Sequence, residues 1–303
     1  MQNKKVYHGL AILLMFIWGL SYLSIKVVVS EIEPTLVAFY RFLIASIILY
    51  IIMKLKYPEE KVLKEDKIKM MLGGFFGVAL YFFFENYAVS FTSASNVSIL
   101  ISSIPIFTLL SQRIIFKEKL TTFKILGATL SVIGIIIVVS SKDKVNLFSS
   151  GTLGDLMALG AAISWVIYNI VTSKFKGEYK SITISTYQTI FGTIFLSPAL
   201  LISKPTMPSS LAIINILYLS IACSVVGYII YIFCLKKLGP TVITTYINLQ
   251  PIISLTASAL ILKESVTFVQ VIGSMIIITG VFFVNADNRF SKKRFEESIW
   301  SES

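Results

Sequence analysis

Glu85, Arg41 and Lys26 are ionisable side chains inside segments that are otherwise apolar. Glu85 follows four aromatic residues in the run YFFFENYAVSF, and the other two lie in the two preceding apolar segments. An ionised side chain in hydrocarbon is costly, so each of them is expected to face another charge or a water-filled cavity. Counting residues along helices places all three at a similar depth. An ion pair between Arg41 and Glu85 is the simplest arrangement.

Glu85 has two interpretations, and the sequence leaves both open. In the structural one, it neutralises Arg41 and fixes two helices together. In the functional one, it exchanges a proton or contacts a cationic group of a substrate. Lys26 could likewise line a cavity, or it could extend its amine to the membrane interface. If all three line one cavity, their charges sum to one positive charge, which favours a substrate that carries a carboxylate.

Aromatic and amide side chains are the remaining candidates for a cavity lining. Rings can pack against a substrate, and amides can donate and accept hydrogen bonds. Polar side chains in a membrane also join one helix to another, which is the alternative for each of them. The candidates are Trp18, Tyr81, Asn86, Trp165, Tyr168, Asn169, Gln188, Tyr228, Tyr246, Asn248 and Gln250.

Pro105 and Pro251 each interrupt an apolar segment. The second follows the polar run TTYINLQ. A proline within a helix removes one backbone hydrogen bond and disfavours helical geometry in the residue before it. Both positions are therefore predicted to be hinges, and a static kink filled by packing is the alternative.

Small residues and one acid predict local helix structure. Gly127 and Gly134 are seven residues apart in one segment, as are Gly273 and Gly280 in another. This spacing gives each helix one small face that is suited to close packing. Asp155 lies at the start of an apolar segment and is predicted to be its N-cap.

The composition identifies the class of protein that positions these residues. Of 303 residues, 55% are apolar and only 14% are charged, whereas about 25% are charged in soluble domains. The mean hydropathy is +0.81. Apolar blocks of roughly 17–25 residues match a bilayer-spanning helix. The sequence therefore predicts an all-α polytopic membrane protein with ten spans: Tyr7–Val29, Thr35–Met53, Met70–Phe91, Ser95–Phe116, Lys124–Ser140, Gly154–Thr172, Ile182–Ile202, Leu211–Leu235, Pro240–Leu262 and Phe268–Val284.

The basic residues predict the orientation of these spans. With the N-terminus in the cytoplasm, inside segments carry 21 lysines and arginines and outside loops carry 4. Positive residues concentrate in cytoplasmic loops, so both termini are predicted to be cytoplasmic, including the tail 286–303. The net charge of +11 is thus explained by loop charges, and no nucleic-acid partner is expected.

The two halves of the sequence repeat each other. At a shift of 146 residues, Pro105 aligns with Pro251, the pair Lys117–Glu118 with Lys263–Glu264, and the paired glycines with each other. Trp18 aligns with Trp165 at a shift of 147. These matches predict one repeat at 7–140 and a second at 152–285.

Each repeat holds five predicted spans, which is an odd number. The second repeat therefore enters the membrane from the opposite side, and the two form an inverted repeat. Transporters that expose one site alternately to the two sides of a membrane are often built in this way. The pair Lys117–Glu118 is predicted to lie inside and Lys263–Glu264 outside.

Several segments resemble the drug/metabolite transporter superfamily, in particular its EamA-type ten-helix members. They are FIWGLSYLSIK and SNVSILISSIPIFTLL in the first half and GDLMALGAAISWVIYNIVTSK and QPIISLTASALILKES in the second. The resemblance implies a carrier that moves small metabolites across the plasma membrane without ATP. It also implies a central cavity lined by the first four helices of each half, with the last helices peripheral and a homodimer possible.

Other functions lack their motifs. The sequence holds no Walker loop, no HExxH motif and no Cys/His cluster, so no cofactor, metal or catalytic residue is expected. The leading hypothesis is a secondary active transporter of a small organic metabolite such as an amino acid, acting in export, with the lipid bilayer and the substrate as its partners. An exporter of organic cations or drugs, and a membrane scaffold or enzyme without transport, are the alternatives.

Overall fold

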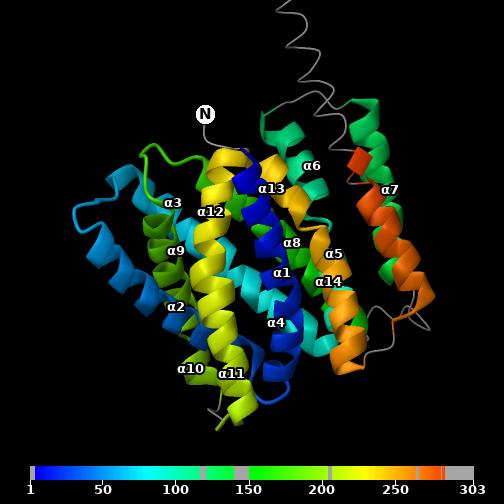
Figure 1. Ribbon diagram of the computed structural model, residues 1–303, viewed down its shortest axis with the longest axis horizontal. Helices are drawn as coiled ribbons and strands as arrows, with labels where there is room; N and C mark the ends of the chain where they lie inside the picture. The colour runs from blue at the N-terminus through cyan, green and yellow to red at the C-terminus, as the bar shows by residue number, and fades with distance from the viewer. Residues whose placement is uncertain are drawn as a thin grey trace, which may run out of the picture.

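The computed structural model describes residues 4–116, 121–139, 150–203, 207–263, 266–280 and 282–283, and this part of the chain contains helices and no strand. The all-α prediction is therefore confirmed. The predicted cytoplasmic tail 286–303 and the residues Lys117, Glu118 and Glu264 lie outside the described ranges. Figure 1 shows long helices packed side by side, with α1 near the middle of the bundle.

The first repeat forms helices at the positions expected for its spans. One predicted span runs unbroken from Lys64 to Phe91 as three helical segments, and the next is interrupted by a turn. The elements are α1 (Lys4–Val29), α2 (Pro34–Lys56), α3 (Lys64–Gly74), the π-helix η1 (Phe75–Leu80), α4 (Tyr81–Phe91), α5 (Ala94–Ile101), α6 (Ile104–Phe116) and α7 (Thr122–Val139).

The second repeat follows the same plan. Its elements are α8 (Ser150–Ser173), α9 (Ser181–Leu196), α10 (Ala199–Ile202), α11 (Ser210–Tyr218), the π-helix η2 (Leu219–Val226), α12 (Gly227–Leu238), α13 (Pro240–Tyr246), α14 (Leu249–Ala257) and the π-helix η3 (Ser258–Leu262). A last apolar helix covers Phe268–Gly280.

Eight helices in the described ranges are long and apolar enough to cross a membrane. They correspond to eight of the ten predicted spans. The predicted fifth and tenth spans contain shorter apolar helices, Ile125–Ile137 and Phe268–Gly280. A multi-pass helical membrane protein is therefore established, and the exact number of spans stays a prediction.

The two repeats deviate from regular α-helix at equivalent places. The π-helices η1 and η2 both lie in the third span of their repeat, and the shift of 146 residues brings Leu80 onto Val226. The fourth span of each repeat is interrupted by a turn, at Ser102–Ser103 and at Ile247–Asn248. Each turn ends shortly before a proline, Pro105 or Pro251. Since π-helices and broken spans concentrate at functional sites, these four places direct attention to the centre of the bundle.

The repeats interlock in the bundle. Helix α4 packs on α8, α2 packs on α9, and α1 packs on both α12 and α14. Consequently, a cavity at the middle of the bundle has walls from both repeats.

Hydrogen bonds join the repeats at both ends of the bundle. At one end, which we call the Asp66 face, the buried Asp66 carboxylate accepts from the backbone N–H groups of Lys176 and Gly177 and from the Tyr179 hydroxyl. We call the opposite end the Glu33 face, because the Ser203 hydroxyl donates to the Glu33 carboxylate there. At the same end, Glu31 accepts from the backbone N–H and hydroxyl of Ser209. The ties of Asp66 and Glu31 each connect the start of a third span to the loop after the first span of the other repeat.

Helix α7 and the helix Phe268–Gly280 lie beside each other at one edge of the bundle (Figure 1). A Cβ atom added at Gly134 would lie 2.7 Å from Ile277 Cγ1 and 2.8 Å from the Gly273 carbonyl oxygen. One added at Gly280 would lie 2.4 Å from the Gly127 carbonyl oxygen. The glycine faces of the two helices therefore pack against each other.

Asp155 departs from its prediction. Helix α8 already begins at Ser150, so Asp155 lies within the helix and is not its N-cap. Its carboxylate is buried and accepts a hydrogen bond from the Asn96 side chain at 2.6 Å. The prediction was wrong because hydropathy does not register the polar first turn of this helix.

A candidate binding pocket between the repeats

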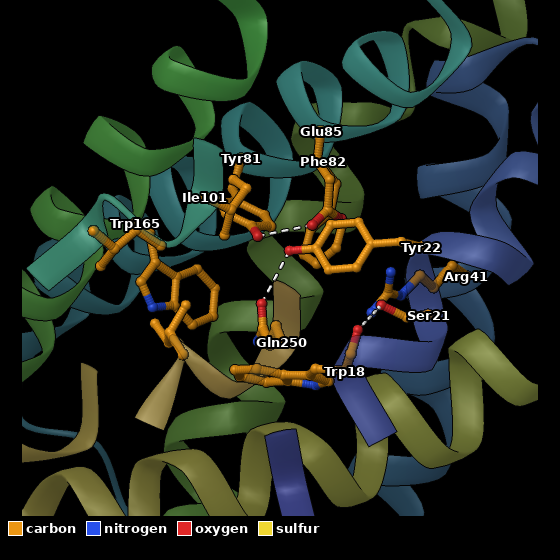
Figure 2. A pocket seen from close by; sticks show the side chains of 12 residues that line it. Trp18, Ser21, Tyr22, Arg41, Tyr81, Phe82, Glu85, Ile101, Trp165 and Gln250 are labelled. Carbon is orange, nitrogen blue, oxygen red and sulfur yellow. Dashed lines mark hydrogen bonds between the residues drawn. The ribbon is translucent and has the colours of Figure 1, made fainter. Parts of the chain in front are cut away.

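A pocket lies at the centre of the bundle, where helices of both repeats meet. Its volume is ≈ 20 Å³, and one water molecule needs roughly 10–15 Å³ by the same measure. The pocket is therefore contracted, and a metabolite can enter only when the surrounding helices move apart. It is lined by Trp18, Ser21, Tyr22, Arg41, Tyr81, Phe82, Glu85, Ile101, Ile104, Trp165, Ile247 and Gln250 (Figure 2).

Repeat-equivalent residues of the two halves line this pocket together. Trp18 and Trp165 pair at a shift of 147 residues, Ile101 and Ile247 at 146, and Ile104 and Gln250 at 146. The last two pairs flank the interrupted turns of the fourth spans. The pocket thus lies between the two repeats.

Arg41 reaches the pocket from α2 and is only 2% exposed. Its Nε atom donates a hydrogen bond to Ser224 Oγ in η2 at 2.7 Å. Its guanidinium lies over the Phe82 ring, with 4.2 Å between Cζ and the ring centroid. Its Nη1 atom is buried and has no hydrogen-bond partner. The side chain is thus held by one nitrogen and one ring face, and a second nitrogen is left for another acceptor.

Glu85 reaches the pocket from α4 and is 3% exposed. One of its oxygens, Oε1, accepts a hydrogen bond from the Tyr81 hydroxyl at 2.8 Å, and the other, Oε2, is buried without a partner. The expected direct ion pair is wrong: among the described residues, no nitrogen of Arg41 lies within the 4.0 Å limit of a Glu85 oxygen. The reason is that Ser224 and Phe82 hold the guanidinium.

Tyr22 and Gln250 connect the two repeats on the pocket wall. The Tyr22 hydroxyl donates to Gln250 Oε1 at 3.0 Å. In Figure 2 the Tyr22 hydroxyl points toward the side chain of Gln250, which comes from α14. These groups give the pocket neutral hydrogen-bonding atoms beside its two charges.

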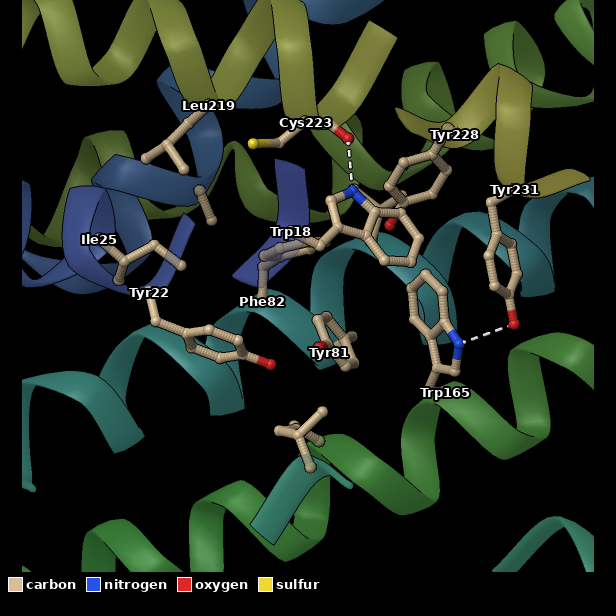
Figure 3. Packing of buried hydrophobic residues seen from close by; sticks show 14 of the residues in the cluster. Trp18, Tyr22, Ile25, Tyr81, Phe82, Trp165, Leu219, Cys223, Tyr228 and Tyr231 are labelled. Atoms are coloured by element: carbon tan, nitrogen blue, oxygen red, sulfur yellow. Dashed lines mark hydrogen bonds between the residues drawn. The ribbon is translucent and has the colours of Figure 1, made fainter. Parts of the chain in front are cut away.

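Five buried rings pack together beside the pocket, and four of them are on α8 and α12, which end at the Asp66 face. We call them the aromatic cluster: Trp18, Trp165, Tyr168, Tyr228 and Tyr231 (Figure 3). Trp165 Nε1 donates to the Tyr231 hydroxyl at 3.0 Å, and that hydroxyl donates to Asn169 Oδ1 at 2.8 Å. Trp18 Nε1 donates to the Cys223 carbonyl at 3.0 Å. The cluster is therefore held by polar contacts as well as by packing.

Six of the fourteen predicted cavity residues line this pocket: Trp18, Arg41, Tyr81, Glu85, Trp165 and Gln250. Of the others, Tyr168, Asn169 and Tyr228 lie in or against the aromatic cluster. The Tyr228 hydroxyl donates to the Gly77 carbonyl in η1. The Gln188 amide donates to Thr172 in α8.

The remaining four predicted residues lie farther out. Lys26 donates to the carbonyls of Val89 and Thr92, so it joins α1 to the end of α4 near the Glu33 face. Asn86 donates to the Pro34 carbonyl. Tyr246 contacts His8, and Asn248 lies in the interrupted turn.

Six lining residues were not predicted: Ser21, Tyr22, Phe82, Ile101, Ile104 and Ile247. Tyr22 had a usable signal, because it lies four residues after Trp18 and four before Lys26, on the same helix face. The isoleucines had none, since an apolar residue of a span has the same type whether it faces lipid or a cavity.

Comparison with known proteins gives one consistent result. The EamA-like transporter family matches residues 6–140 and 152–286. A protein of Archaeoglobus fulgidus that is named an uncharacterized transporter is 32% identical over 288 residues, which are 94% of this chain and 98% of that protein. A probable amino-acid metabolite efflux pump of Escherichia coli is 26% identical over 289 residues, covering 90% and 92% of the two chains. One solved crystal structure shares the fold with a TM-score of 0.67 at 13% identity, covering 93% of this chain and 98% of that one.

Proposed function

Since this chain belongs to the EamA-like transporter family, we propose that it is a secondary active transporter whose central pocket opens alternately to the two sides of the membrane. Membership makes it a transporter and not an enzyme, which removes the enzyme alternative. To this we add a mechanism, an orientation and a substrate.

One observation carries the alternating mechanism: equivalent residues of both repeats line a single pocket. In an inverted repeat, each half can adopt the conformation of the other, and this exchange moves the opening from one side to the other. The contracted pocket suits an intermediate in which neither side is open. If the hydrogen bonds between the repeats break at one face and stay intact at the other, the pocket opens toward the first face.

The orientation is derived from the charges. We place the Asp66 face in the cytoplasm, because the 21 basic residues of the inside segments belong to this side. Under this proposal all ten predicted helices span the plasma membrane, and both termini are cytoplasmic. The aromatic cluster then lies between the pocket and the cytoplasm.

The substrate we propose is a small organic metabolite such as an amino acid, moved in the direction of export. The Escherichia coli relative named as a probable amino-acid metabolite efflux pump supports this choice. The alternative, an exporter of organic cations, is favoured by the Glu85 carboxylate and the aromatic rings, which attract cations. Arg41 in the same pocket disfavours it.

Reconstitution into liposomes tests the proposal. The liposomes carrying the purified chain would be loaded with one unlabelled compound at a time, and entry of the same labelled compound would be measured as counterflow. We expect counterflow with at least one amino acid and none with a panel of organic cations. Counterflow with the cations alone would replace our choice with the alternative, and a chain inactive with every amino acid and cation would contradict both.

A further inference from the structure

We propose that Arg41 and Glu85 bind the two opposite charges of one zwitterionic substrate. Arg41 binds its carboxylate, and Glu85 binds its ammonium group. This inference rests on the proposed function, because the bound molecule is a substrate only if the protein transports it. The binding itself can be measured without transport.

Each of the two charged groups in the pocket has one atom without a hydrogen-bond partner. Arg41 Nη1 and Glu85 Oε2 are both buried, and neither has a hydrogen-bond partner. Both residues line the pocket (Figure 2). A buried polar atom without a partner is a destabilising feature, and the more so when its group is charged. Such an atom requires a partner, which a water molecule, an ion or a ligand can supply. Among the described residues with such an atom, only Arg41 and Glu85 line the pocket.

The other atoms of both groups are already fixed. Ser224 Oγ and the Phe82 ring hold Arg41, and the Tyr81 hydroxyl holds Glu85 Oε1. These anchors keep the two groups from closing into a direct ion pair. A donor and an acceptor of opposite charge thereby belong to one pocket, as a molecule that carries both an ammonium and a carboxylate group requires.

The second repeat has no charges at the equivalent positions. At shifts of 146 and 147 residues, the positions equivalent to Arg41 hold Tyr187 and Gln188, and those equivalent to Glu85 hold Tyr231 and Ile232. The repeat scaffold therefore forms without charges at these places. Both charges thus occur in one repeat only, which fits a role in selecting the substrate rather than in holding the fold.

The test compares ligands whose charges are removed one at a time. The panel contains neutral α-amino acids, β-alanine and 4-aminobutyrate. Each is measured beside its amide, which keeps only the positive charge, and its N-acetyl derivative, which keeps only the negative charge. Binding to the purified chain in detergent is followed by tryptophan fluorescence, since Trp18 and Trp165 line the pocket, and by the shift in melting temperature.

We expect at least one zwitterion to bind tenfold or more tightly than both of its derivatives. Glu85→Gln should remove the preference over the N-acetyl derivative, and Arg41→Gln should remove the preference over the amide. The exposed Glu178 and Lys237 provide matched controls, because Glu178→Gln and Lys237→Gln change the same charges outside the pocket.

Several results would overturn the inference. Equal binding of a zwitterion and its derivatives to the wild-type chain would do so even if neither variant folds, and so would an unchanged preference in a folded Glu85→Gln variant. Selective binding without counterflow would contradict the proposed function and leave this inference standing. If a compound with a single charge shows counterflow and no zwitterion binds, the proposed transport function stands and this inference is contradicted.

Discussion

Trp18 and Trp165 pack edge to face at the centre of the protein, with ring centroids 5.5 Å apart and an interplanar angle of 87°. The two residues occupy equivalent positions in the two repeats, and both line the pocket. Their partners differ: Trp18 donates to a backbone carbonyl and Trp165 to the Tyr231 hydroxyl. The repeats are thus symmetric in the position of their rings and asymmetric in the polar contacts around them.

The first prediction concerns the anchor of Arg41. Ser224→Ala removes the acceptor for Arg41 Nε, and a hydrogen bond to a charged group contributes about 1.5–3 kcal/mol. We expect the KM for counterflow to rise about tenfold, since 1.4 kcal/mol corresponds to that factor. Ser220→Ala in the same π-helix is the control, because the Ser220 hydroxyl donates to the Ile216 carbonyl and not to the pocket. An unchanged KM in Ser224→Ala would show that Phe82 alone positions the guanidinium.

The second prediction concerns the tie at the Asp66 face. Asp66→Asn replaces an acceptor of several hydrogen bonds with an amide whose NH₂ group faces other N–H donors. We expect the free energy of unfolding to fall by about 2 kcal/mol, measured by thermal or denaturant unfolding in detergent. Glu31→Gln at the opposite face is the comparison and should have little effect, because that carboxylate is exposed. Equal losses in the two variants would contradict this prediction.

The third prediction concerns pH. Burial raises the pKa of Glu33, but hydrogen bonds from Tyr87, Thr35 and Leu36 lower it by more, so the net pKa is below its ordinary value. A carboxyl with a lowered pKa stabilises the folded state above its unfolded pKa, roughly 4.3, and this contribution is lost as the pH falls through the folded pKa.

The melting temperature of the wild-type chain should therefore fall as the pH drops below about 4.3. In Glu33→Gln, this decline in melting temperature should be less steep. Between roughly pH 6 and 8, the substitution should not change how the melting temperature depends on pH. The measurement is a melting series over pH, with Glu178→Gln as the control for an exposed carboxylate. A decline as steep in Glu33→Gln as in the wild type would rule out this role for the carboxylate.

The fourth prediction concerns the peripheral helix pair. Gly134→Val places atoms against Ile277 and the Gly273 backbone, and such overpacking costs about 1–3 kcal/mol. We expect a lower melting temperature with ligand binding retained, because no residue of α7 or of the helix Phe268–Gly280 lines the pocket. Gly9→Ala should be neutral, since a Cβ there meets nothing within 4 Å. Loss of binding at an unchanged melting temperature would refute the separation of the two regions.

The repeat was the part of the structure that the sequence predicted best. Aligning Pro105 with Pro251 and Trp18 with Trp165 predicted the two repeats, and the resemblance to the EamA-type family implied a central cavity lined by helices of both halves. The predicted contact between Arg41 and Glu85 was wrong. Ser224, which holds the guanidinium, lies 183 positions away, and no periodicity or charge pattern reveals such a long-range acceptor.

The direction of a side chain was not predictable from the sequence. Counting along helices predicted a similar depth for Lys26 and Glu85 and suggested one cavity, yet Lys26 turns to the carbonyls of Val89 and Thr92 and does not line the pocket. Those carbonyls lie at the end of α4 and are open to a donor only because the helix stops there. The predicted end of this span, Phe91, agrees with the structure, but the sequence does not show toward which neighbouring helix the Lys26 side chain turns.

The last prediction separates a hinge from a static kink at Pro105 and Pro251. Proline cannot donate to the carbonyl four residues earlier, and those residues are Ile101 and Ile247, which line the pocket. In the double variant Pro105→Ala/Pro251→Ala, both N–H groups are restored and can straighten the fourth spans. If these turns move during transport, the maximal rate of counterflow should fall at least tenfold while ligand affinity in detergent changes less than threefold.

A static kink predicts a different outcome, because the turns would then only shape the pocket. Affinity and rate would change together, or neither would change. Pro34→Ala is the control, since Pro34 is the first residue of α2 and its missing N–H has no helical partner. The fourth span is interrupted at the same position in both repeats, which favours movement. If the turn of one repeat bends when the pocket opens toward one side, the equivalent turn of the other repeat must bend when it opens toward the other side.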